Sequence, residues 1–318
     1  MRYTDLFTHK FIITRETGSF KHLSELINSK DFEVITPILL NSSFKLGNHS
    51  RSSESLLNNE ICKFACAALE SFVEITSNKI SQKSLSWALI RTYYASFFAA
   101  HACLKAVGFF VSRLDRKSCD IIQQEALIYY PGNVKPLATD YLVKYYQDLN
   151  ELEFIQLNSI HGGSYHERFW PVYNDFIDIG LNSPLATQLT YQDDILFIRS
   201  IKDAMNFKGV PYWLSTKRNE INYKLPCELW FPYENSKKAI YYENLIKSNC
   251  KKRNNLLDYN DFNSADELVR FNIICTSIID FMIQVVDEYF NKSEIRGNLK
   301  KATYNRILKI YLQNKYAT

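Results

Sequence analysis

The sequence predicts a mainly α-helical protein of 318 residues. Glycine (9) and proline (8) are scarce, which disfavours a loop-rich all-β fold and favours long helices. Apolar residues make up 46% of the chain, enough for a substantial core. In several long stretches they recur at steps of three and four, the period of an amphipathic helix. We therefore expect a helical bundle with an N-terminal α/β extension and a central insertion.

Residues 1–50 form the predicted extension. Two runs rich in β-branched residues, 11–14 and 32–36, lie on either side of a short helical stretch at residues 23–27. These runs indicate some β structure here, including a hairpin. The helical domain is predicted to span residues 51–290, with the insertion at about 109–189, and a basic helix is expected over residues 291–318.

Two long helices open the helical domain. Ser52 and Ser53 offer an N-cap for a helix that ends near residue 76. Its apolar side chains share one face: Leu57, Ile61, Phe64, Ala68, Phe72 and Ile75. After a polar turn, Ser84 caps a second helix that runs to Val107, with Gly108 as its left-handed C-cap. The short turn predicts an antiparallel hairpin of the two helices.

The rest of the chain is also predicted to be largely helical. In the insertion we expect helices at about 117–127 and 138–149, separated by a Pro-Gly break at 130–133. Further helices are expected at about 191–206, 212–223, 237–246, 264–290 and 299–313. Ser264 would cap the fourth of these, with Asp266 and Glu267 favourably placed in its first turn.

Two motifs carry a family resemblance. The second helix contains Arg91-Thr-Tyr-Tyr-Ala-Ser-Phe-Phe-Ala-Ala100, and a later helix contains Lys217-Arg-Asn-Glu-Ile-Asn-Tyr-Lys224. In this order they resemble the HEPN-like helical bundles, over residues 53–108 and 190–290. The resemblance implies an up-and-down bundle in a bacterial toxin, a toxin partner or an anti-phage defence component. It also implies a homodimer, or attachment to a partner protein encoded in the same operon.

The resemblance also implies a chemistry. Active members of the family cut RNA without a metal: the ribose 2′-OH attacks the phosphate, a histidine moves protons and an arginine stabilises the developing charge. Arg218 occupies the arginine position and Asn219 the polar position after it. Tyr223 stands where the histidine would be, and residues 167–318 contain no histidine. A phenol with a pKa near 10 is a poor base at neutral pH.

Two other histidines are candidate bases. His101 lies on the Tyr-Tyr-Ala helix, where a core position is the alternative to a catalytic role. His161 and His166 lie on either side of a Gly-Gly pair, with Glu167 and Arg168 beside His166, which suggests a catalytic or ion site. Arg218 and Tyr223 have a structural alternative too, as residues that fix a helix end.

Two functional hypotheses remain open on the sequence. The first is an accessory or binding subunit that keeps the bundle for assembly and recognition and lacks the histidine. The second is a metal-independent endoribonuclease in which Arg218 is kept and Tyr223, His166 or His101 replaces the usual base. Neither requires a cofactor or a metal.

Basic residues near the C-terminus add a possible RNA contact. The formal net charge is only +4, but residues 292–315 contain seven Lys and Arg against one acid, Glu294. Phosphate backbone attracts such clusters, so we name four candidates there: Lys300, Lys301, Arg306 and Lys309. A solvated helix face is the alternative.

The remaining composition points to a reducing compartment. The seven cysteines are scattered, several within apolar helical stretches, and no pair has the spacing of a zinc site. The most apolar runs, 97–111 and 271–286, are interrupted by polar residues, and the N-terminus lacks a signal-peptide core. We expect a cytoplasmic protein.

Overall fold

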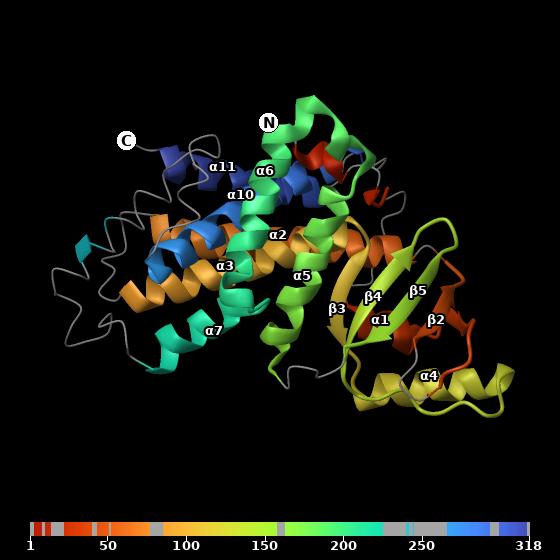
Figure 1. The fold of residues 1–318 in the computed structure, drawn as a ribbon. Helices are drawn as coiled ribbons and strands as arrows, with labels where there is room; N and C mark the ends of the chain where they lie inside the picture. The colour runs from red at the N-terminus through yellow and green to blue at the C-terminus, as the bar shows by residue number, and fades with distance from the viewer. Residues whose placement is uncertain are drawn as a thin grey trace.

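The protein is a bundle of long helices with a small sheet beside it, as the ribbon of the computed structural model shows (Figure 1). This arrangement confirms the mainly helical prediction. The structure describes residues 3–7, 10–13, 22–39, 43–50, 52–76, 85–157, 163–224, 240–241, 244, 266–292 and 299–316.

Seven helices make up the described part of the bundle: α2 (Ser52–Thr76), α3 (Leu85–Ala106), α5 (Tyr165–Leu181), α6 (Gln192–Met205), α7 (Trp213–Asn219), α10 (Glu267–Lys292) and α11 (Leu299–Tyr316). Short 3-10 turns accompany them: η1 (Tyr3–Leu6), η3 (Pro184–Thr187), η4 (Leu189–Tyr191) and η5 (Phe207–Gly209). A π-helical segment, η6 (Glu220–Lys224), continues α7. The helices predicted at 52–76, 84–107, 191–206, 212–223, 264–290 and 299–313 are thereby confirmed.

α3 lies at the centre of the bundle, packed against α2 and α10. Its many alanines allow the neighbouring helices to approach closely, and 18 of its 22 residues are buried. The predicted cap is confirmed: Gly108 has φ +80°, and its N–H donates to the Lys105 carbonyl at 3.0 Å. The Ser84 and Ser264 caps and most of the helix expected at 237–246 fall outside the described residues.

α10 is long and apolar enough to cross a membrane by length and composition, and 83% of its most apolar window is buried inside the protein. This burial accounts for its composition, because a helix that is apolar all round also suits a protein core. At its start, the Asp266 carboxylate accepts hydrogen bonds from the backbone N–H groups of Leu268 (2.9 Å) and Val269 (3.3 Å).

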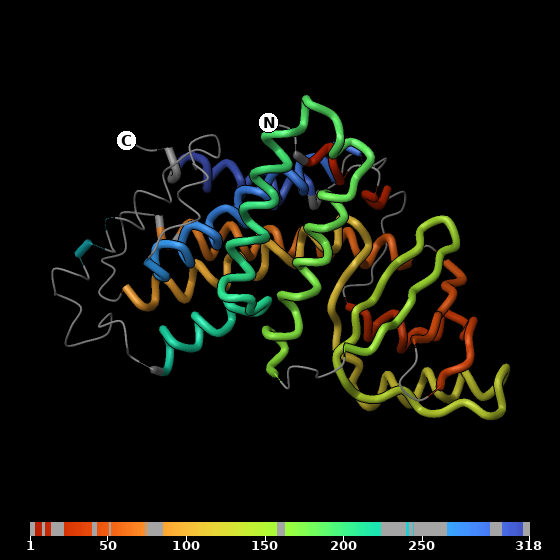
Figure 2. Tube along the Cα trace, viewed as in Figure 1, coloured from red at the N-terminus to blue at the C-terminus, as the bar shows by residue number. Residues whose placement is uncertain are grey.

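The sheet joins segments that are distant in the sequence. Its strands are β1 (Phe32–Val34), β2 (Phe44–Asn48), β3 (Phe109–Arg113), β4 (Asp140–Tyr146) and β5 (Glu151–Gln156), in the order β1-β2-β5-β4-β3. All neighbours are antiparallel, and β2 pairs with β5 through Phe44 opposite Phe154. Figure 2 shows the orange trace of β2 beside the yellow-green β4–β5 hairpin. α1 (Leu23–Ser29) and α4 (Arg116–Tyr129) share a second hydrophobic core with these strands.

The helix predicted at 138–149 is wrong, because this segment forms β4 and the turn into β5. Tyr141, Val143 and Tyr145 alternate with more exposed residues, which is the period of a strand. The β prediction for residues 32–36 is confirmed in β1, which pairs with β2, but the prediction for 11–14 is wrong, because residues 11–13 are described and lie in no strand. The helix expected at 117–127 is confirmed as α4. We did not predict α5, which begins at a Ser164–Glu167 capping box and contains Pro171.

Candidate functional site

Three helices bring an arginine, a histidine and a tyrosine together. Tyr93 lies fully buried on α3, His166 is in the first turn of α5, and Arg218 is in the last turn of α7. The ring centroids of Tyr93 and His166 are 5.6 Å apart, and the guanidinium carbon of Arg218 lies 5.4 Å from the Tyr93 centroid. The structure therefore places two residues that the sequence nominated separately, Arg218 and His166, around one ring.

The Tyr93 hydroxyl determines the state of His166. Trp170 Nε1, which can only donate, lies 3.1 Å from this hydroxyl, and His166 Nδ1 lies 3.0 Å from it. The phenol oxygen thus accepts from Trp170, and its proton is available to a neutral imidazole at Nδ1. In that arrangement His166 carries its own proton on Nε2, and no residue in the described part of the chain accepts a hydrogen bond from this N–H.

Arg218 is a buried cation that pairs with no acid among the described residues. Its exposure is 8%, and its Nε has no hydrogen-bond partner. Its guanidinium carbon lies over Tyr93 and also 5.7 Å from the Tyr94 centroid. Within the described residues no carboxylate forms an ion pair with it. Cation–π contacts offset part of the cost of burying this charge, but a buried charge normally needs an opposite charge as well.

Burial and charge together keep His166 neutral. Loss of solvent, and secondly the positive charge of Arg218, lower the pKa of His166 to about 4. Burial likewise raises the pKa of Tyr93 far above neutral pH, so the phenol keeps its proton. At neutral pH the site therefore has a single net positive charge and presents N–H donors, which is the chemistry of an anion site.

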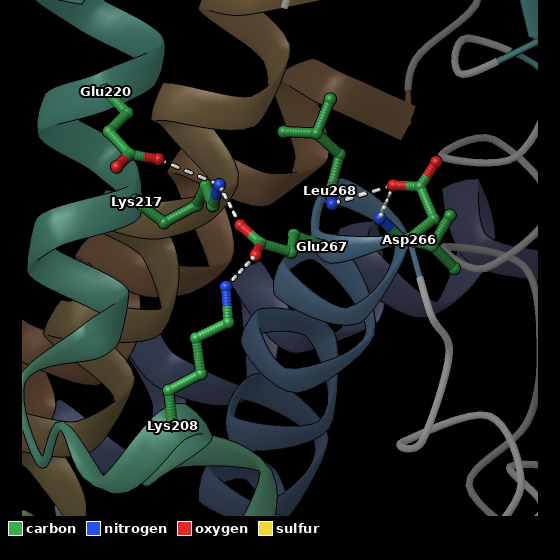
Figure 3. A network of polar contacts seen from close by, with 7 residues as sticks. Lys208, Lys217, Glu220, Asp266, Glu267 and Leu268 are labelled. Atoms are coloured by element: carbon green, nitrogen blue, oxygen red, sulfur yellow. Dashed lines mark hydrogen bonds and ion pairs between the residues drawn. The ribbon is translucent and has the colours of Figure 1, made fainter.

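A network of charges holds α7 in place (Figure 3). Lys217 Nζ lies 2.8 Å from Glu220 and also contacts Glu267, at the start of α10. The second oxygen of Glu267 lies 2.8 Å from Lys208 Nζ, and hydrogen bonds from the two lysines lower the pKa of Glu267. Because Lys217 precedes Arg218 directly, this network fixes the turn of α7 from which Arg218 extends.

The other nominated residues lie elsewhere. His101 is buried, with its ring centroid 4.8 Å from Phe64 and 4.1 Å from Phe169, and burial lowers its pKa. Tyr223 is 71% exposed and Asn219 is half-buried, and neither has a described contact with His166. The structure thus assigns His101 to the core and gives Tyr223 no place in the cluster.

The neighbours of His166 have structural tasks. Glu167 accepts a hydrogen bond from the backbone N–H of Ser164 at 2.7 Å, as part of the α5 cap. Arg168 pairs with buried Asp140 at 2.9 Å and donates to the Gly163 carbonyl. His161 lies outside the described residues.

The basic C-terminal residues lie on α11, which packs mainly on α2. Arg306 and Lys309 are exposed, and Lys301 Nζ lies 3.2 Å from Asn291 Oδ1. Lys300 belongs to the same helix, but its side chain is outside the described part of the structure.

Sequence reasoning missed the aromatic half of the site. Tyr93 and Tyr94 are the Tyr-Tyr pair of the motif, which we interpreted only as part of the helical frame. Trp170 follows His166 by four residues, one turn of a helix, which would have been a signal had α5 been predicted.

No match emerges when the chain is compared with protein-family models, with curated proteins or with solved structures. Across the described residues, no group of three or more His, Cys, Asp and Glu side chains is arranged to hold a metal ion.

Proposed function

We propose that the protein is a HEPN-like RNA-binding subunit of a bacterial toxin or anti-phage defence assembly, in which Arg218 and His166 bind a phosphate of the RNA. One observation carries this proposal: the Arg218 guanidinium is buried with no carboxylate of the described residues paired to it, beside a neutral histidine whose Nε2–H is a donor. A phosphate supplies both the missing negative charge and acceptor oxygens for a planar fork of donors.

Phosphate fits the cluster better than a carboxylate of the protein would. A fixed internal acid would neutralise Arg218 permanently, whereas the cation–π contacts with Tyr93 and Tyr94 offset only part of the cost of burying its charge, so an arriving anion stabilises it further. The half-buried ring of Tyr94, beside Arg218, offers a face on which a nucleotide base stacks. Assembly as a homodimer, or with a partner protein of the same operon, belongs to the proposal through the family resemblance.

The proximity of His166 to Arg218 favours a second candidate, a metal-independent endoribonuclease. In this reaction a base removes the 2′-OH proton, the oxygen attacks phosphorus, and the 5′ oxygen leaves with a proton from an acid. His166 is the histidine beside Arg218, so it would be the proton-transfer group. A bound phosphate raises its pKa from about 4 by adding negative charge, which improves it for this task.

One experiment separates the two candidates. Purified protein is incubated with labelled RNA in EDTA, and binding is followed by anisotropy and cleavage by gel, for wild type, Arg218→Gln, His166→Asn and the exposed control Arg199→Gln. Binding without cleavage, weakened by Arg218→Gln but not by Arg199→Gln, supports the binding subunit. Cleavage to a 2′,3′-cyclic phosphate that both site variants abolish supports the ribonuclease. Absence of binding, or binding indifferent to both site variants, overturns both candidates.

A further inference from the structure

The end of α4 and the loop that follows it present an apolar surface to solvent. Five large apolar side chains there are between 39% and 67% exposed: Leu127, Ile128, Tyr129, Val134 and Leu137. We call these five residues the α4 patch. Single exposed apolar residues are ordinary on a protein surface, but a group of them in one place marks an interaction site.

The loop runs back along α4, so its side chains lie beside those of the helix end. Lys135 pairs with Asp120, and Leu127 follows Asp120 by seven residues, two turns along the same face of α4. The buried Asn133 side chain fixes the turn between helix and loop by donating to the Ala126 carbonyl at 3.0 Å. The α4 patch therefore has its shape before a partner arrives, which lowers the entropic cost of binding.

The surface around the α4 patch is electrically balanced. Residues 121–139 contain only two charged side chains, Glu125 and Lys135, and both form ion pairs within the protein. Glu125 lies 2.8 Å from Lys30 Nζ, and Lys135 contacts Asp120. A nucleic acid requires unpaired cations, and this stretch of the chain offers none. A second copy of the same surface, in contrast, is apolar and meets no like charge.

The size of the α4 patch matches the apolar centre of a dimer interface. At about 200 Å² for a fully open large side chain, its five residues together expose about 500 Å². Apolar atoms make up about 60% of an interface, so a polar rim extends this to about 800 Å² per protomer. A standard stable interface buries about 800 Å² on each partner.

We propose that the α4 patch is the contact face of a symmetric homodimer, in which each protomer covers the patch of the other. α4 packs on α1 and β1 beside the sheet, whereas Arg218 and His166 lie on α7 and α5 in the helical bundle (Figure 1). Contact through α4 therefore leaves the phosphate site of each protomer open. The dimer goes beyond the proposed RNA contact and does not depend on it.

The test compares Ile128→Asp with Leu189→Asp by analytical ultracentrifugation. Ile128 is 67% exposed in the α4 patch, and Leu189 is the control, 90% exposed on η4 of the bundle. Wild type at a concentration on the order of 100 µM should sediment with twice the 37.2 kDa mass of the chain. Ile128→Asp should weaken the dimer at least about 10-fold, because a carboxylate loses its water in the contact. Leu189→Asp should dimerise like wild type.

Leu137→Asp is a second variant, on the loop instead of the helix, and should give the same loss. A monomeric wild type overturns the proposal, and so does a dimer that both patch variants leave intact. A mass that rises beyond two chains with concentration also overturns it, since a contact between identical faces closes at two. A monomer whose RNA binding depends on Arg218 would leave the proposed function standing, and a dimer that binds no RNA would leave only the α4 patch.

Discussion

Removal of the Arg218 charge should raise the pKa of His166. The substitution Arg218→Gln keeps a polar side chain of similar reach but eliminates the positive charge that opposes protonation of the imidazole. Burial is the larger of the two causes of the low pKa. Because the substitution leaves the imidazole buried, that part of the pKa shift remains in the variant. We therefore expect a pKa between about 4 and the ordinary value of 6.5.

The effect of His166 on the free energy of unfolding follows from the difference between the ordinary pKa and the pKa in the folded protein. The wild-type difference, 6.5 − 4 = 2.5 pH units, corresponds to about 3.4 kcal/mol at about 1.36 kcal/mol per unit, and solvent screening at the partly exposed ring leaves about 1 to 2 kcal/mol. Since the unfolded chain takes up its proton first, this stability is present above pH 6.5 and is lost as the pH falls toward 4. Arg218→Gln should make that loss smaller.

The assay is NMR titration of the imidazole Cε1–H signals, with His166→Asn to assign the resonance. Urea unfolding at pH 7 and pH 5 reports the stability change in parallel. Arg199→Gln removes an exposed arginine of α6 and should leave the His166 titration unchanged. A His166 pKa that stays at the wild-type value in Arg218→Gln, or that falls, would refute the placement of the guanidinium beside the imidazole.

Two further substitutions test the packing around the site. Tyr93→Phe removes the hydroxyl that accepts from Trp170, so a buried indole N–H loses its partner; urea unfolding should show a loss of about 1–3 kcal/mol, and an unchanged midpoint would contradict the bond. Gly180→Ala would place a Cβ 2.3 Å from the Phe7 ring, so overpacking should cost about 1–3 kcal/mol by thermal unfolding. Gly132→Ala, where a Cβ meets nothing within 4 Å, is the control, and equal effects of the two would refute the packing.

The helical frame could be predicted because its signals are local. The apolar spacing of α2 and the Gly108 cap lie within single helices, so the sequence contains all the information that determines them. The sheet could not be predicted in this way, since β2 pairs with β5 across about a hundred residues. Tyr141 to Tyr145 have the alternation of a strand, but the apolar content of this segment also suits a helix.

The site could be predicted only in parts. Arg218 was nominated by its motif and His166 by its Gly-Gly neighbourhood, but 52 residues separate them and α5 was not expected. Their contact depends on how α5 and α7 pack against α3, which no local pattern encodes. Tyr223 was a candidate base on motif spacing alone, and in the structure the π-helical turn of η6 leaves its side chain exposed.

The salt dependence of RNA binding tests the phosphate site most directly. Affinity for a single-stranded RNA is measured over a range of salt concentrations for wild type, Arg218→Gln and Arg199→Gln. If Arg218 contacts a phosphate, Arg218→Gln should weaken binding about 10- to 100-fold. It should also reduce the slope of log affinity against log salt concentration by about one, while Arg199→Gln changes neither quantity. Equal affinity and equal slope for wild type and Arg218→Gln would contradict the site.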